Sequence, residues 1–151
     1  MPAAPSSKTR WIYEHHGVAA AYIAKRTNTV FSLDHHGWLC LDADDRLVGA
    51  VLLHDFDGHQ VMFSIALTPK ARILPSDLRR LCEAAFNQLD ATRIEMRNSP
   101  TNDPAIKMAR VFGMTLEGTR RYARPNGDDE HIWGLLKEDC RWLRRPQTTE
   151  Q

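Results

Sequence analysis

Several side chains in the first half of the sequence could take part in proton transfer. His54 and His59 are candidates for a general base, because an imidazole has a pKa of about 6.5 and changes charge near neutral pH. Asp55 and Ser64 lie close by in the sequence and join them as candidate catalytic residues. Asp57-Gly58-His59 is also typical of a hairpin turn, which is the favoured interpretation of Asp57.

The other residues that could do chemistry are paired histidines and cysteines. Adjacent residues of a strand point to opposite faces, so His15-His16 and His35-His36 make poor metal ligands, and no metal is predicted. The cysteines are odd in number and widely spaced, which excludes a disulfide framework and favours a reducing cytoplasm. Cys82 is expected to pack in the core. The three cysteines are Cys40, Cys82 and Cys140.

Length and composition indicate one ordinary domain. The chain has 151 residues, of which 42% are hydrophobic and 26% charged, which argues against disorder. The formal net charge is +1, yet residues 1–68 carry five basic and seven acidic side chains, whereas residues 69–151 carry fifteen and twelve. No apolar run is long enough to span a membrane, and Met1 to Lys8 lacks the core of a signal peptide.

Apolar spacing predicts the elements of the first half. Residues 17–26 are expected to form a helix, and 38–41, 47–53 and 61–67 to form three consecutive strands. Residues 1–9 and 146–151 have no pattern to bury and are expected to be flexible ends of a domain that spans 10–145.

The second half should alternate helices and strands. Ser76 is expected to cap an amphipathic helix that runs to Leu89, and Asp103 to cap a second helix that stops at Gly113. A strand at 93–97, a hairpin of 114–122 with 131–136, and a helix over 138–145 complete the order. Such alternation predicts a mixed α/β (α+β) domain.

Residues 102–121 carry a family resemblance. The spacing of Asn102, Ala105 and Gly113, followed by Glu117-Gly118 in a strand, resembles the GCN5-related N-acetyltransferase (GNAT) superfamily. Residues 126–143 resemble its ribosomal-protein alanine acetyltransferase branch and small phage acetyltransferase-like proteins. The resemblance covers roughly 10–145 and implies a mixed, largely antiparallel sheet splayed in the middle, with flanking helices.

That resemblance implies acetyl-CoA as acyl donor and an amine acceptor, with direct transfer between them. Residues near Ser64 on the fourth strand of the fold would hold the thioester oxygen, and Lys107 and Arg110 would meet the 3′-phosphate. The pyrophosphate loop departs from the family, because it has no glycine, and because Pro75 and Asp77 stand where donors and positive charge are expected. His54, Asp55, His59 and Ser64 would face the gap, and Tyr122 is a distant substitute for the family's tyrosine acid, whose position holds Ala109. The implied cofactor-binding residues are Ile65, Ala66, Leu67, Lys70, Arg72, Ser76, Asn102, Ala105, Lys107 and Arg110.

Two other functions stay open. The atypical loop and the missing tyrosine would also suit a non-catalytic binding or inhibitory protein that keeps the fold. Arginines around Tyr122 and Trp142 could serve a nucleic-acid partner or a modified base as acceptor, although interleaved acidic residues favour a salt-bridged surface. A protein or small-molecule acceptor and a homodimer are further expectations.

Overall fold

The computed structural model describes residues 8–13, 16–27 and 35–143. The chain divides into two compact units, Met1–Ile73 and Leu74–Gln151. The described residues form three α-helices and seven strands, which confirms the predicted α/β (α+β) class. No helix within the described ranges is both long and apolar enough to cross a membrane.

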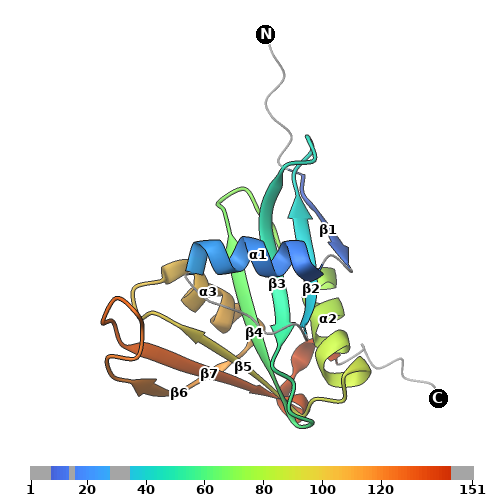
Figure 1. The fold of residues 1–151 in the computed structure, drawn as a ribbon. Coiled ribbons are helices and arrows are strands. Elements are labelled where there is room, and N and C mark those ends of the chain that lie inside the picture. Colours follow the sequence, from blue (N-terminus) through green and yellow to red (C-terminus); the bar gives the residue numbers. More distant parts are fainter. Residues whose placement is uncertain (1–7, 14–15, 28–34, 144–151) are drawn as a thin grey trace, which may run out of the picture. The chain divides into compact units, whose positions relative to one another are not determined.

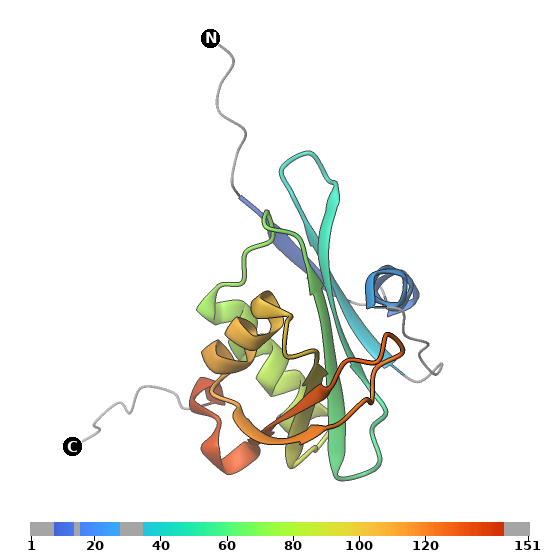
Figure 2. The ribbon, with the colours of Figure 1, turned by 90° about the vertical axis from the view of Figure 1, so that its left-hand side faces the viewer.

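The first unit is an antiparallel sheet with one helix on a face (Figures 1 and 2). Its strands lie in the order of the sequence, and α1 crosses β2, β3 and β4. The sequence did not predict β1, because its four residues are too few to give a periodic signal. β2 begins three residues earlier than expected. The elements are β1 (Arg10–Tyr13), α1 (His16–Thr27), β2 (His35–Leu41), β3 (Leu47–His54) and β4 (Gln60–Leu67).

Small residues let α1 approach the sheet closely. Ala19 and Ile23 of α1 are fully buried against a cluster that includes Leu52 of β3. A Cβ on Gly37 would meet the Ala19 Cβ at 2.5 Å, so this position of β2 needs glycine. The Gly37 N–H donates to His16 Nδ1 at 2.7 Å, which fixes the first residue of α1 to β2.

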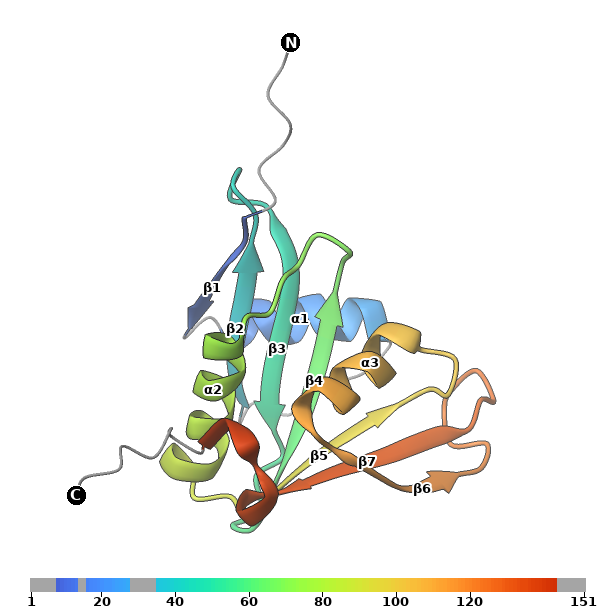
Figure 3. The same ribbon diagram turned by 180° about the vertical axis from the view of Figure 1, so that it is seen from behind.

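The second unit contains a three-stranded antiparallel sheet with the order β5-β7-β6, and α3 contacts β5 (Figure 3). The long amphipathic helix expected to reach Leu89 changes to a π-helix in its last turn. Lys137 Nζ donates to the Phe86 carbonyl of this turn at 3.2 Å. The elements are α2 (Pro75–Glu83), the π-helix Ala84–Gln88, β5 (Arg93–Asn98), α3 (Asp103–Phe112), β6 (Thr115–Arg120) and β7 (Glu130–Leu136).

Both predicted N-caps are shifted. Leu74 holds the cap position of α2, and its N–H donates to Asp77 Oδ2 at 2.8 Å, whereas Ser76 lies inside the first turn. Asn102, not Asp103, caps α3, because its side chain accepts from the Ala105 N–H at 3.3 Å. In both cases a proline follows the true cap and fixes the first helical residues.

The predicted C-terminal helix is wrong. Residues 137–139 and 141–143 form two 3₁₀ turns, and 144–145 lie outside the described residues. Trp142 Nε1 donates to the Phe112 carbonyl at 3.1 Å, and Arg141 donates to the Val111 carbonyl. Gly113 ends α3 as predicted, with a φ of 87°. These contacts satisfy carbonyls at the end of α3 and hold the segment against it, in place of a continuous helix.

Candidate functional site

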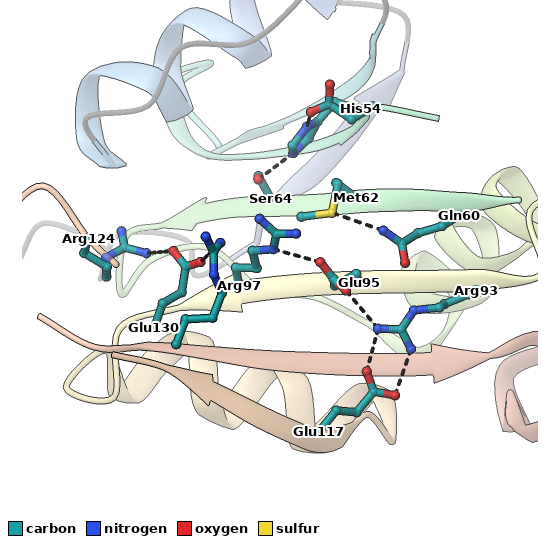
Figure 4. A network of polar contacts seen from close by, with 12 residues as sticks. His54, Gln60, Met62, Ser64, Arg93, Glu95, Arg97, Glu117, Arg124 and Glu130 are labelled. Atoms are coloured by element: carbon teal, nitrogen blue, oxygen red, sulfur yellow. Dashed lines mark hydrogen bonds and ion pairs between the residues drawn. The ribbon is translucent and has the colours of Figure 1, made fainter. Parts of the chain in front are cut away.

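Three of the predicted catalytic residues meet in the first unit. His54 Nε2 lies 2.7 Å from Ser64 Oγ, and His54 Nδ1 lies 2.6 Å from Asp55 Oδ2. Figure 4 shows the imidazole between β3 and β4, pointing at Ser64. We call Asp55, His54 and Ser64 the proton relay.

Strand register and one unusual backbone angle build this relay. His54 is opposite Met62 and Leu52 is opposite Ser64, so His54 and Ser64 are diagonal neighbours on one face of the sheet. Asp55 follows β3 with a φ of 52°, a left-handed conformation that aspartate tolerates better than most residues. That conformation accompanies the return of the carboxylate to the ring of the preceding residue.

Burial differs along the relay. The His54 side chain is 7% exposed and the Asp55 side chain 57% exposed, while Ser64 is half-buried. The imidazole is therefore held between a hydroxyl on the strand face and a carboxylate in contact with solvent. A carboxylate that accepts from Nδ1–H holds the ring proton on that nitrogen, so Asp55 would leave Nε2 able to take a proton from Ser64.

His59 belongs to the hairpin turn instead of the relay. Asp57 Oδ1 accepts from the His59 N–H at 2.9 Å and from the Gln60 N–H at 2.7 Å. These backbone hydrogen bonds lower the pKa of the Asp57 carboxyl below its ordinary value, and the bond from Gln60 has the larger effect. The turn interpretation of Asp57 is therefore the one that the geometry favours, and His59 is an exposed turn residue.

The direction of each β4 amide decides which could meet a thioester oxygen. The Thr68 N–H donates to the Val48 carbonyl at 2.9 Å, so the antiparallel alternation directs the Ala66 N–H toward β3 as well. The amides of Ile65 and Leu67 point away from β3. Ala66 is thus a poor candidate donor of a hydrogen bond to that oxygen, and the register from Gly49 to His54 is regular.

The predicted pyrophosphate loop has few backbone donors left. The Arg72 N–H donates to Thr9 Oγ1 at 3.2 Å, and the Arg72 carbonyl accepts from Trp11 Nε1 at 2.9 Å. The Ala71 N–H donates to the Thr68 carbonyl at 3.0 Å. Lys70 and Arg72 are exposed, so their side chains could reach phosphates while the main chain of Arg72 is occupied.

The start of α2 is also partly occupied. Its positive N-terminal end faces the carboxylate of Asp77, which accepts from the Leu74 N–H, and Pro75 has no N–H to offer. Ser76 is exposed in the first turn. The Asp77 side chain therefore caps the helix, whereas the Ser76 side chain does not.

We expect Thr9→Val to loosen the main chain at Arg72. One exposed hydrogen bond contributes about 0.5–1.5 kcal/mol, so hydrogen exchange at the Arg72 amide should accelerate about 2- to 10-fold. Trp11→Phe is the matched control, since it removes a donor to the Arg72 carbonyl and leaves the N–H bond to Thr9 in place. NMR would measure this exchange rate, and equal rates at the Arg72 amide in wild type and Thr9→Val would contradict the contact.

The residues of α3 and its cap that were predicted to bind acetyl-CoA differ in exposure. Asn102 is exposed but its side chain caps the helix, and Ala105 is buried with its N–H on Asn102. Lys107 and Arg110 are exposed and lie on one side of α3 at i, i+3. They remain candidates for a phosphate contact.

The predicted acid Tyr122 and part of the predicted basic patch lie at or next to the β6–β7 connection. Tyr122 is 81% exposed, with a φ of 56°, and lies outside β6, so the strand expected to reach residue 122 ends at Arg120. Arg120 and Arg124 both bind Glu130, with separations of 3.2 and 3.3 Å. This pairing favours the salt-bridged surface over a free basic patch among the described residues, while Arg144 and Arg145 lie outside them.

An ionic network in the second unit was not expected from the sequence. Arg93 binds Glu95 at 2.9 Å and also forms two hydrogen bonds to Glu117, and Arg97 Nε reaches Glu95 at 2.8 Å (Figure 4). A Cβ on Gly134 would lie 2.3 Å from Arg93 Nη1, so glycine on β7 lets Arg93 cross to β6. The alternation of charged and apolar residues along β5 was the available signal.

The cysteine thiols have a structural place in the fold. Cys82 is fully buried, as predicted, and its hydrogen bond with Cys140, with burial, raises the pKa of its thiol far above the ordinary value. None of the three cysteines forms a disulfide. Within the described ranges no three His, Cys, Asp or Glu side chains gather to hold a metal, and the absence of a metal stays a prediction.

The family comparison agrees with this fold. The sequence model of the acetyltransferase (GNAT) domain matches residues 3–115, and the chain belongs to that family. The matched span includes the proton relay, the loop after β4 and α3, but not β7 or the residues behind the branch resemblance. A search of curated proteins found no match.

Solved acetyltransferases share the fold. A GNAT-family acetyltransferase from Bacillus anthracis is 22% identical, with a TM-score of 0.58, and the alignment covers 68% of this chain and 66% of the other, just under two thirds of its length. A dodecameric spermidine N-acetyltransferase from Vibrio cholerae is 16% identical, with a TM-score of 0.67 and coverage of 94% and 100%. At such identities the likeness establishes the fold alone.

Proposed function

We propose that the protein transfers an acetyl group from acetyl-CoA directly to an amine. The observation that carries this proposal is the proton relay, because an ammonium must lose a proton before its nitrogen can attack a thioester. The new bond joins the amine nitrogen to the carbonyl carbon as the carbon–sulfur bond breaks. Ser64 Oγ would pass the amine proton to His54 Nε2, and the leaving thiolate takes up a proton.

The donor's carbonyl oxygen would meet amides that point away from β3. Ile65 and Leu67 supply such amides, whereas Lys70, Arg72, Lys107 and Arg110 would contact phosphates through their side chains. Ser76, Asn102 and Ala105 are proposed as weaker contacts to the donor. Tyr122 would be a poorly supported acid, because it is 81% exposed. The occupied main chain at Arg72 predicts weaker donor binding than a glycine-rich loop gives.

The acceptor is proposed by class only. The acidic excess of residues 1–68, with five basic and seven acidic side chains, favours a cationic amine of a small molecule or a protein. The spermidine enzyme of similar fold acts on a small polyamine by its name. A modified base is a weaker acceptor because Arg120 and Arg124, near Tyr122, are both paired with Glu130. The ribosomal-protein alanine acetyltransferase-like branch, the phage-like group, a homodimer and a cytoplasmic location remain hypotheses.

Acetyl-CoA binding and turnover test this proposal. At a hundredfold excess over Kd, a ligand that binds only the folded chain adds about 2.7 kcal/mol of stability, which raises the melting temperature. We expect such a shift with acetyl-CoA and release of free CoA thiol when spermidine or a lysine peptide is added. No shift at millimolar acetyl-CoA would overturn the proposal.

A second candidate is a binding or inhibitory protein that keeps the fold without catalysis. The closed main chain at Arg72 and the Asp77 carboxylate at the start of α2 favour it. Binding of CoA without any amine acetylation across both acceptor classes would support this candidate over the enzyme.

A further inference from the structure

We propose that Ser64 is a nucleophile, and that the protein hydrolyses activated short acyl esters through an acetyl-Ser64 intermediate. This activity goes beyond amine acetylation by direct transfer. It uses the proton relay but needs neither coenzyme A nor an amine, so the two activities can fail separately.

The geometry has the three parts that serine nucleophiles require. His54 Nε2 is 2.7 Å from Ser64 Oγ, within the reach expected of a general base for a hydroxyl. Asp55 Oδ2 is 2.6 Å from His54 Nδ1, where it would hold the ring and stabilise its cation. The same roles recur on unrelated folds, so they are recognised by geometry and not by chain order.

The surroundings separate Ser64 from an ordinary strand serine. His54 is 6% exposed, so the imidazole itself is largely shielded from solvent, and Ser64 keeps part of its surface. Ser99, another half-buried serine, instead contacts Thr101 Oγ1 at 2.9 Å and Asp128 Oδ2 at 3.5 Å. The Ser64 hydroxyl has an imidazole as its proton acceptor. The Ser99 hydroxyl has only a hydroxyl and a carboxylate, which are weaker bases than an imidazole.

The Ile65 N–H, one residue on from Ser64, is the candidate donor for the oxyanion. The Ile65 N–H points away from β3, by the same alternation that directs the Ala66 N–H into the ladder. Serine hydrolases commonly use the amide that follows the nucleophile for this purpose. A developing negative charge on the carbonyl oxygen would therefore find an amide next to the attacked carbon.

The two steps balance without a further reactant. Ser64 Oγ attacks the ester carbonyl as its proton moves to His54 Nε2, the carbon–oxygen bond to the leaving group breaks, and His54 returns the proton to a leaving alkoxide. Water then attacks the acetyl-Ser64 ester, with its proton going to His54 and back to Ser64 Oγ. The net reaction turns an ester and water into acetic acid and an alcohol, and an acidic leaving group such as p-nitrophenol departs as the anion with the proton released to solvent.

The test uses the full chain with p-nitrophenyl acetate and no coenzyme A. We expect a burst of about one p-nitrophenol per chain, a mass gain of one acetyl group, and its location on the peptide that contains Ser64. A fluorophosphonate should label the same residue. His54→Gln should slow both reactions by about 10²-fold or more, and Ser64→Ala should abolish the modification there.

Ser99→Ala is the matched control and should leave labelling unchanged. Modification of lysines or of another serine with Ser64 unmodified, or labelling that His54→Gln does not slow, would overturn the proposal. Peptide mapping of the wild-type chain decides this even if Ser64→Ala fails to fold. Acetyl transfer from acetyl-CoA to spermidine is measured in parallel, so Ser64 acylation without transfer would sink only the proposed acetyltransferase.

Discussion

Replacing His54 by glutamine is expected to lower kcat/KM for amine acetylation by about 10²- to 10⁴-fold, the usual contribution of a positioned acid or base. Glutamine fills similar space and can still hydrogen-bond, but it cannot take up a proton. The KM for acetyl-CoA should change little, because the proposed phosphate contacts come from Lys70 and Arg72. Steady-state kinetics with the thiol product as readout would measure both constants.

Two further measurements separate proton transfer from structure. His59→Gln changes a turn histidine outside the relay and should affect kcat/KM far less. The wild-type rate should fall at acidic pH, where a protonated imidazole can accept nothing, and this dependence should be lost in His54→Gln. Equal effects of the two substitutions, with unchanged melting temperatures, would exclude His54 as the base.

Replacing Arg93 by methionine is expected to lower the free energy of unfolding by about 2–3 kcal/mol. Arg93 is 17% exposed and Glu95 9% exposed, so the loss leaves a buried carboxylate with Arg97 as its remaining arginine. The value lies below that of a fully buried pair because the Glu117 side chain is 37% exposed and solvent screens it. Urea unfolding at neutral pH measures the loss.

The difference in unfolding free energy between wild type and Arg93→Met should depend on pH. The hydrogen bond from Arg93 lowers the pKa of the Glu117 carboxyl in the folded chain. Stability from that shift is present above the unfolded pKa of about 4.3 and is lost as pH falls through the folded pKa. The gap between wild type and Arg93→Met should therefore narrow in acid. Arg79→Met, an exposed arginine of α2, serves as control and should stay within about 0.5 kcal/mol.

Local sequence signals determined most of the elements and placed the relay members among the candidates. The spacing of Leu78, Leu81 and Cys82 predicted a buried helix face, and Gly113 predicted the end of α3. His54, Asp55 and Ser64 were candidates because their types suit proton transfer. Both kinds of prediction depend on residues within a few positions of one another, where the chain itself restricts geometry.

Tertiary structure alone decided which of those candidates meet. Ser64 reaches His54 and His59 does not, because strand register places 54 and 64 on one face while Asp57 binds 59 into the turn. The closure of the loop at Arg72 required β1, a strand too short to give a pattern. Arg93 and Glu117 are 24 positions apart and meet only because Gly134 leaves room between them. Periodicity reports which face a residue occupies, whereas contacts between distant segments depend on register and packing that no local pattern encodes.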